Sequence, residues 1–244
     1  MNNLIIDFGN SYKKIAIENN GEIIFINQYF DFSVIELQEL ESKYSFNNII
    51  MSTVLFLDKN LENYLHSKYN FIKISHKTPI PIINNYQTPQ TLGGDRLACA
   101  VAAHTLYPES NCLIIQMGSC ITFDFVNNKG EYQGGSISPG LNMRFKALHT
   151  YTKKLPYLCY HSTGGLIGNS TNESIQLGVA NGIILECNGM INQYKNIYPN
   201  LKVLLTGGDF FMFENKSQHE IISIPNLVLV GLSIILKYND AKKN

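Results

Sequence analysis

The sequence predicts an α/β protein built from two similar halves. Strand-like and helix-like hydrophobic patterns alternate along its 244 residues, and 45% of these residues are apolar, which is enough for a sizeable core. Residues 5–11 (IIDFGNS) and 114–120 (IIQMGSC) also share one pattern: an apolar strand, a polar residue, an apolar residue, a glycine and then small side chains. Such a repeat indicates duplicated domains, here 1–112 and 113–244, facing each other; chance similarity of two short strands is the alternative.

The first half reads as a hairpin followed by alternating helices and strands. Asn20-Gly21 between two apolar runs predicts a β-hairpin. Ser33 and Asp58, residue types that cap helix N-termini, each precede helix-like spacing. A stretch at 75–94, rich in Pro, Asn, Thr and Gly, predicts a long loop. The expected elements are strands at 3–7, 13–18, 22–27 and 48–52, and helices at 32–44, 58–67 and 97–106.

The second half repeats the order of strand, turn and strand and then adds helices. Gly118-Ser119 separates its first two strands, and Asn127-Asn128 forms the next turn before a segment that reaches Gly135. The other expected elements are a strand at 203–205 and helices at 141–151, 174–192 and 227–238, with the first two strands at 113–116 and 121–126.

Composition excludes several classes of function. Lys plus Arg equals Asp plus Glu, 19 each, so no excess charge favours nucleic acid or an acidic membrane as partner. The apolar runs are too short to span a bilayer, and the N-terminus lacks the pattern of a signal peptide. Five scattered cysteines without a C-x-x-C pair predict reduced thiols in the cytoplasm, and the histidine spacing disfavours zinc.

Four glycine-centred turns follow strands and indicate phosphate binding. They lie after Asp7, at Gly118, at 134–140 and at 206–209. Glycine has no Cβ, so backbone N–H groups can approach phosphate oxygens closely. The common P-loop and Rossmann glycine patterns do not occur, which disfavours those nucleotide folds.

Polar residues beside the first two turns suit the same chemistry. Ser11 and Ser119 offer hydroxyl donors, and Lys14 offers positive charge. Asp7, at the carboxyl end of the first strand, can hold Mg²⁺ directly or through water. An ordinary hairpin turn explains the D-x-G-N-S pattern equally well when it is taken alone.

The segment Leu92–Arg96 (LGGDR) places an acidic residue, Asp95, directly before a basic residue, Arg96, between a loop and a helix. Asp95 can accept a proton from a hydroxyl group as its oxygen attacks phosphorus. Arg96 can pair with a carboxylate or with the charge of a phosphate. The alternative is a helix-start aspartate next to a solvated arginine.

Together these motifs resemble the type III pantothenate kinases, a family within the superfamily of acetate and sugar kinases, heat-shock chaperones and actin. The resemblance runs nearly from end to end, and the spaced Tyr-Pro-Leu-Gly-x-Asp-Arg motif within 86–96 is its most specific part. The other matching segments are 7–11, 118–124, 134–140, 168–171 and 205–208.

The family resemblance implies two ribonuclease-H-like domains with mixed sheets facing a central nucleotide cleft. It implies ATP-dependent phosphorylation of pantothenate to 4′-phosphopantothenate, the first step of coenzyme A biosynthesis, with Asp95 as the general base. Pantothenate would be held by Tyr86, Gly93, Gly94, Asp95 and Arg96, and by Thr171 from the neighbouring subunit of a homodimer. ATP would be held by Asp7, Phe8, Gly9, Asn10, Ser11, Tyr12, Lys13, Lys14 and Ser119, with Gly207 and Gly208 near adenosine and Asp7 holding Mg²⁺ indirectly.

Two residues depart from the family pattern. Ser11 replaces the usual threonine and keeps its hydroxyl group, whereas Gln116 replaces an aspartate that commonly binds a monovalent cation such as K⁺ or NH₄⁺. Glutamine offers a carbonyl oxygen without charge, so this chain has either a weak cation site or no need of one. Asp124 is expected to orient the second turn. A non-catalytic regulatory or accessory relative, and another small-molecule kinase of the superfamily, remain the alternatives.

Overall fold

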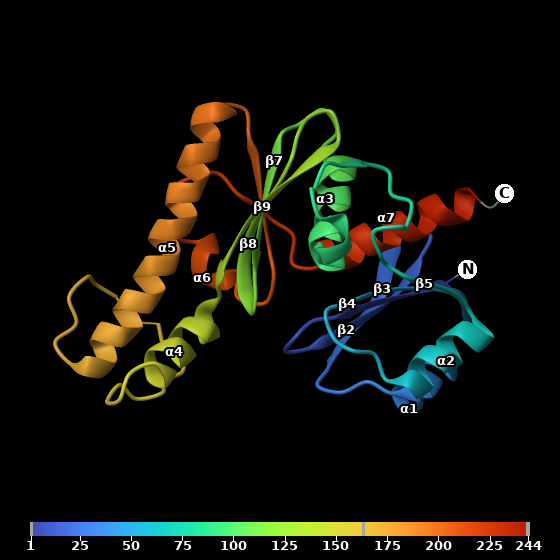
Figure 1. The fold of residues 1–244 in the computed structure, drawn as a ribbon, viewed down its shortest axis with the longest axis horizontal. Coiled ribbons are helices and arrows are strands. Elements are labelled where there is room, and N and C mark those ends of the chain that lie inside the picture. The colour runs from blue at the N-terminus through green and yellow to red at the C-terminus, as the bar shows by residue number, and fades with distance from the viewer. Residues whose placement is uncertain (1, 163, 243–244) are drawn as a thin grey trace. The chain divides into compact units, whose positions relative to one another are not determined.

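The computed structural model describes residues 2–162 and 164–242, which divide into two compact units (Figure 1). Unit 1 holds the described residues up to Leu106, then Gly130–Tyr132 and the residues from Asn226 onward. Unit 2 holds Tyr107–Lys129 and Gln133–Pro225. The predicted division of the chain into 1–112 and 113–244 stays a prediction.

A five-stranded mixed sheet forms the centre of unit 1. Its strands are β1 (Asn2–Phe8), β2 (Lys13–Asn19), β3 (Glu22–Tyr29), β4 (Phe46–Thr53) and β5 (Asn70–Lys73). They lie in the order β3-β2-β1-β4-β5, with β1 to β3 antiparallel and β4 and β5 parallel to β1. The parallel strands β1 and β4 therefore end at the same edge of the sheet, where Asp7 pairs in register with Ser52.

Helices cover both faces of this sheet, as the labels in Figure 1 show. The elements are α1 (Val34–Glu41), α2 (Lys59–Lys68), α3 (Gly94–Leu106) and α7 (Leu227–Ala241), with the short β6 (Ile83–Asn84) and η1 (Pro89–Thr91) before α3. Leu4 and Ile6, which alternate on one face of β1, pack with Leu37 of α1 and Leu61 of α2. On the other face α7 crosses β1 and β4, and α3 packs on α7.

Gly231 explains how closely α3 and α7 approach each other. A Cβ at this position would lie 1.9 Å from the carbonyl oxygen of Ala98. The helices can pack at this distance only because glycine lacks a side chain.

A buried carboxylate ties α7 to the sheet. Glu18 is fully buried, accepts a hydrogen bond from Asn3 (2.6 Å) and pairs with Lys237 of α7 (2.9 Å). Burial alone would raise the pKa of Glu18, but the bonds from Asn3, Lys237 and the Gly21 N–H outweigh burial and lower it.

Unit 2 repeats the local strand arrangement of unit 1. Its strands are β7 (Cys112–Met117), β8 (Cys120–Val126), β9 (Glu131–Pro139), β10 (Lys202–Thr206) and β11 (Ile222–Ser223), in a sheet ordered β11-β10-β7-β8-β9-β6. In unit 2, β7 pairs with the antiparallel β8 on one side and with the parallel β10 on the other. In unit 1, β1 pairs in the same way with the antiparallel β2 and the parallel β4. β6 pairs with Glu131 and Tyr132, the start of β9, which belong to unit 1.

The helices of unit 2 are α4 (Leu141–Thr150), the long α5 (Thr171–Ile197) and the short α6 (Phe211–Glu214). Ile115 of β7 and Phe123 of β8 form a core with Phe145 of α4 and Ile183 of α5. Figure 1 shows α5 lying along one side of the sheet of this unit. None of the described helices is long and apolar enough to cross a membrane.

The predicted α/β class with two mixed sheets is confirmed, and so are most elements. Ser33 and Asp58 cap α1 and α2 as predicted. Several details were wrong: α3 begins at Gly94 rather than at 97, and the expected loop at 75–94 contains β6 and η1. Glycine disfavours helix, so the start of α3 at Gly94 could not be predicted from local propensity. The expected glycine turn at 134–140 is strand up to Pro139, because these residues continue β9. The elements β5, α6 and β11 were not predicted from the sequence.

Candidate active site

In unit 1 a cluster of polar residues lies at the edge where β1 and β4 end. Asp7 is partly buried there, with Lys14 opposite it on β2 and Ser52 opposite it on β4. The turn that follows β1 is closed by a hydrogen bond from the Gly9 N–H to the Tyr12 carbonyl oxygen (3.1 Å). The turn therefore emerges beside Asp7 and Lys14, which lie opposite each other on β1 and β2.

Two glycines bring the start of α3 to this edge. A Cβ on Gly94 would lie 2.5 Å from Cγ2 of Ile74 and 3.1 Å from Oγ of Ser52. A Cβ on Gly93 would lie 2.5 Å from Oδ1 of Asp95. Glycine at both positions therefore lets the helix approach β4 and lets the Asp95 carboxyl group fold back over position 93.

Asp7 and Asp95 lie close enough to interact electrostatically. The pKa of Asp7 is raised to about 7, first by burial and then by the negative charge of Asp95, while the positive charge of Lys14 opposes the rise. A bound cation would remove the repulsion between the two carboxylates. This donor set suits a divalent cation, which prefers carboxylate oxygens.

Arg96 lies under an aromatic ring rather than in solvent. Its side chain is buried, with 6% of the residue exposed, and Cζ lies 5.8 Å from the centre of the Tyr86 ring. The Tyr86 N–H donates to Oδ1 of Asn84 (3.0 Å). Asp95 does occupy a helix start, but the alternative of a solvated arginine is wrong. The predicted substrate residues Tyr86, Gly93, Gly94, Asp95 and Arg96 all belong to one stretch of unit 1.

The residues of the first turn differ in what their side chains can do. Phe8 is buried and packs on Phe32, so only its backbone is available to a ligand. Lys13 donates to Asp31 (2.9 Å) and to the carbonyl oxygen of Phe30. Tyr12 lies beside the Phe30 ring. Asn10 and Ser11 are exposed.

In unit 2 three glycine turns meet at the end of β7. The Gly140 N–H donates to the Ser119 carbonyl oxygen (3.1 Å), and a Cβ on Gly140 would lie 2.0 Å from the Gly118 oxygen. Gly207 has φ +103°, and its Cβ would lie 2.0 Å from the Met117 oxygen. Gly208 has open space around its Cβ position. Because β7 and β10 are parallel, Ser119 and Gly208, which follow them, lie at one edge of the sheet.

Gln116 occupies the last part of β7, between Thr122 of β8 and Thr206 of β10 in register. Asp124 is buried and accepts a hydrogen bond from the Thr122 hydroxyl group (2.8 Å). Around position 116, oxygen atoms are therefore available from the hydroxyl groups of two threonines and from the side-chain amide of Gln116. The role of Asp124 in orienting the second turn stays a prediction.

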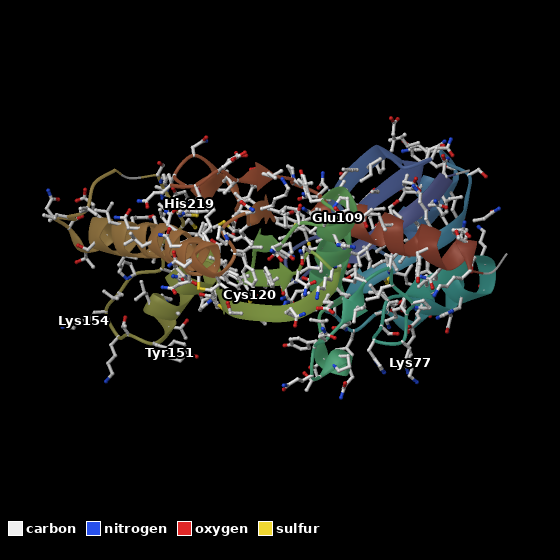
Figure 2. All side chains as sticks on the ribbon, turned by 90° about the horizontal axis from the view of Figure 1, so that it is seen from above. Lys77, Glu109, Cys120, Tyr151, Lys154 and His219 are labelled. Atoms are coloured by element: carbon white, nitrogen blue, oxygen red, sulfur yellow. The ribbon has the colours of Figure 1, made fainter. Side chains whose placement is uncertain are left out.

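Thr171 is the first residue of α5 and lines a surface groove of about 990 Å³ between α4 and α5. Leu148, Leu155 and Val179 give this groove an apolar floor. The side chains of Tyr151 and Lys154, in the exposed stretch after α4, point away from the ribbon (Figure 2). The sequence had not indicated this groove, because its lining comes from separate helices and loops.

Sequence reasoning also missed two buried residues near the unit 1 cluster. Ser52 is fully buried, and its hydroxyl oxygen has no hydrogen-bond partner among the described residues. Tyr132 is fully buried beside Tyr86. A signal for Ser52 existed, since it follows an apolar strand as Asp7 does, whereas Tyr132 reads as an ordinary core residue.

Comparison with known proteins identifies close relatives over the whole chain. A family model described as type III pantothenate kinase matches residues 3–193. A type III pantothenate kinase of Phocaeicola vulgatus is 44% identical over 239 residues, covering 98% of this chain and 99% of that protein. A type III pantothenate kinase of Bacteroides fragilis is 40% identical over 243 residues, covering 98% of this chain and 99% of that protein.

Solved structures share the fold at lower identity. A Campylobacter jejuni protein described as a Baf family transcriptional activator has a TM-score of 0.62 at 23% identity, covering 98% of this chain and 99% of that one. The activator of 2-hydroxyisocaproyl-CoA dehydratase from Clostridium difficile, with bound ADPNP, has a TM-score of 0.56 at 14% identity, covering 100% and 96%. These likenesses show that the fold is shared with both proteins.

The raised pKa of Asp7 predicts a pH-dependent cost to stability. The unfolded chain releases this proton near pH 3.8 and the folded protein near pH 7, so wild-type stability falls as the pH rises through that window. In buffer with a metal chelator, Asp7→Asn should be more stable than wild type at pH 8, by on the order of 2 kcal/mol in urea unfolding.

The advantage of Asp7→Asn should disappear near pH 4, where both proteins carry an uncharged group at position 7. Glu22→Gln, at an exposed position of the same sheet, serves as the control and should show no such trend. Equal stability of Asp7→Asn and wild type at pH 8 would contradict the prediction.

Proposed function

The chain belongs to the type III pantothenate kinase family, and from this we infer that it transfers the γ-phosphate of ATP to the primary hydroxyl group of pantothenate. The product is 4′-phosphopantothenate, formed in the first step of coenzyme A biosynthesis. The observation within the site that carries the inference is the cluster in unit 1. There Asp95 lies within electrostatic reach of Asp7, and the adjacent Arg96 has its Cζ 5.8 Å from the centre of the Tyr86 ring.

We propose Asp95 as the general base. As the substrate oxygen attacks the γ-phosphorus, its proton passes to the Asp95 carboxylate, and the bond from phosphorus to the leaving oxygen of ADP breaks. The negative charge of Asp95 raises the pKa of Asp7, which shows that Asp95 acts electrostatically on the end of β1. Gly93 supports this role because the carboxyl group occupies the space that a side chain would fill.

Arg96 and Tyr86 suit the recognition of a carboxylate. A buried guanidinium held on an aromatic ring keeps its charge and loses little side-chain entropy when it pairs with a carboxylate. Pantothenate carries a carboxylate, and its primary hydroxyl group lies at the other end of the molecule. We therefore assign Arg96 and Tyr86 to pantothenate, together with the backbone of Gly93 and Gly94.

For ATP we assign the first turn, residues 7–14, and Ser119 to the phosphates, and Gly207-Gly208 to adenosine. The open space at Gly208 and the exposed Asn10 and Ser11 support this assignment. Mg²⁺ would be held by Asp7, directly or through water, and would neutralise phosphate charge during transfer. Lys13 and Phe8 would contribute mainly through their backbone.

Turnover with pantothenate tests the function, and Asp95→Asn tests the base. Purified protein with ATP and Mg²⁺ should release ADP with pantothenate but not with sugars or acetate. Asp95→Asn should lose roughly 10²- to 10⁴-fold in kcat, because an amide cannot accept the proton, while ATP binding by calorimetry is retained.

Asp58→Asn is the matched control, since asparagine also caps a helix N-terminus and this variant should keep its activity. Turnover with a sugar or acetate instead would favour another small-molecule kinase, and no turnover at all would favour a non-catalytic relative. Full activity in Asp95→Asn would remove Asp95 from the role of base.

We further propose that this enzyme depends weakly on a monovalent cation. Gln116 and the neighbouring threonines supply neutral oxygens, and the position carries no charge of its own. A hard cation such as K⁺ binds more tightly to a charged carboxylate than to an amide oxygen.

Gln116→Asp should therefore increase the activation by K⁺ or NH₄⁺ relative to wild type. The measurement is ADP release across a titration of KCl at constant ionic strength. Gln116→Asn, which stays neutral, is the control and should leave the activation unchanged. A Gln116→Asp variant with no stronger activation would contradict the proposal.

We also propose a homodimer in which Thr171 reaches the substrate site of the neighbouring subunit. Thr171 is exposed at the start of α5, and the groove beside it has an apolar lining that a second copy could cover. Five free thiols support the cytoplasm as the compartment in which the enzyme works.

Mixing two inactive variants tests the dimer. Thr171→Ala and Asp95→Asn should each be impaired alone. A mixed dimer combines Asp95 of one chain with Thr171 of the other in one intact site, so co-expression at equal ratio should restore about a quarter of wild-type activity. Failure of the mixture to exceed the separate variants would place Thr171 in the site of its own chain.

A further inference from the structure

The segment that carries Tyr86 is attached to the start of β9. The Ile83 N–H donates to the Gly130 carbonyl oxygen (2.9 Å), and the Asn85 N–H donates to the Tyr132 carbonyl oxygen (3.0 Å). Asn84 pairs with Tyr132 in register. Between β5 and α3, regular structure is limited to the two residues of β6 and the single turn of η1.

The side chains continue this attachment toward α3. The rings of Tyr132 and Tyr86 lie 6.2 Å apart between centres and are tilted by 37°. The Tyr86 ring in turn lies 5.8 Å from Cζ of Arg96. Both distances fall within the range of attractive ring–ring and cation–ring contacts. Three side chains therefore form a continuous row from β9 through the loop to the first turn of α3.

The two tyrosines of this row differ in burial. Tyr132 has no exposed surface and is among the largest fully buried side chains of the chain, whereas Tyr86 is partly exposed. A partly exposed tyrosine on a loop can rotate away from Arg96 unless something behind it limits its movement. Groups that bind a substrate are effective when a packed layer behind them restricts their rotamers.

We propose that Tyr132 is a positioning residue for pantothenate, which acts by holding the Tyr86 ring against Arg96. The inference rests on the proposed function, in which Tyr86 and Arg96 bind the substrate. The proposal requires that a change at Tyr132 weaken the binding of pantothenate more than the binding of ATP. Tyr132 belongs to neither the phosphate-binding turns nor the base, so the affinity for ATP and the rate of transfer at saturation should depend on it little.

Removal of the ring tests the proposal. Tyr132→Leu should raise the KM for pantothenate by about tenfold, with kcat and the KM for ATP within about twofold of wild type. Tyr132→Phe keeps the ring and should leave the KM for pantothenate close to wild type. Tyr44→Leu, at a partly buried tyrosine packed in the core beneath α1 and α2, controls for general loosening of unit 1.

A double variant tests whether Tyr132 acts through Tyr86. Tyr86→Leu with Tyr132→Leu should raise the KM for pantothenate no further than Tyr86→Leu alone. If Tyr132→Leu does not fold, Tyr132→Met replaces it, because methionine fills an irregular space without a ring. An unchanged KM for pantothenate in the folded variant, or an equal rise in the KM for ATP, would overturn the inference.

Hydrogen exchange gives a readout that does not depend on turnover. Amides of residues 83–87 should exchange several-fold faster in Tyr132→Leu than in wild type, while those of α2 stay unchanged. Unchanged exchange in residues 83–87 would overturn the role of Tyr132. Absence of wild-type turnover with pantothenate would overturn the proposed function instead, so the two failures are distinguishable.

Discussion

The close approach of α3 to the ends of β1 and β4 is the constraint on which the site in unit 1 depends. Gly94 faces Ile74 and Ser52 at distances that leave no room for a side chain. This approach places Asp95 in the first turn of the helix, within electrostatic reach of Asp7. A larger residue at position 94 would move the helix start outward and separate the two carboxylates.

The same approach has an energetic cost that suits a kinase. Two carboxylates in a partly buried position repel each other, and burial adds to the rise in the pKa of Asp7. Lys14 offsets only part of this repulsion. Strain of this kind at a functional site is a common compromise between stability and activity. Elsewhere in unit 1 a buried carboxylate, Glu18, is fully paired with Asn3 and Lys237 and serves the structure.

Both units use the end of a strand and a glycine turn in the same way. In unit 1 the turn after β1 closes on Gly9, and in unit 2 the turn after β7 packs against Gly140 and Gly207. The shared pairing of a central strand with an antiparallel hairpin partner and a parallel neighbour explains why the turns occupy equivalent positions.

Local chemistry was sufficient for most strands, the hairpins, the caps at Ser33 and Asp58 and the glycine turns after β1, β7 and β10, because each depends on neighbours in the sequence. Tertiary packing alone decided that α3 begins at Gly94 and that Asp95 comes within electrostatic reach of Asp7. It also decided that Tyr132 stands behind Tyr86. These contacts join residues far apart in the chain, and their strength comes from burial and close approach, which no local pattern records.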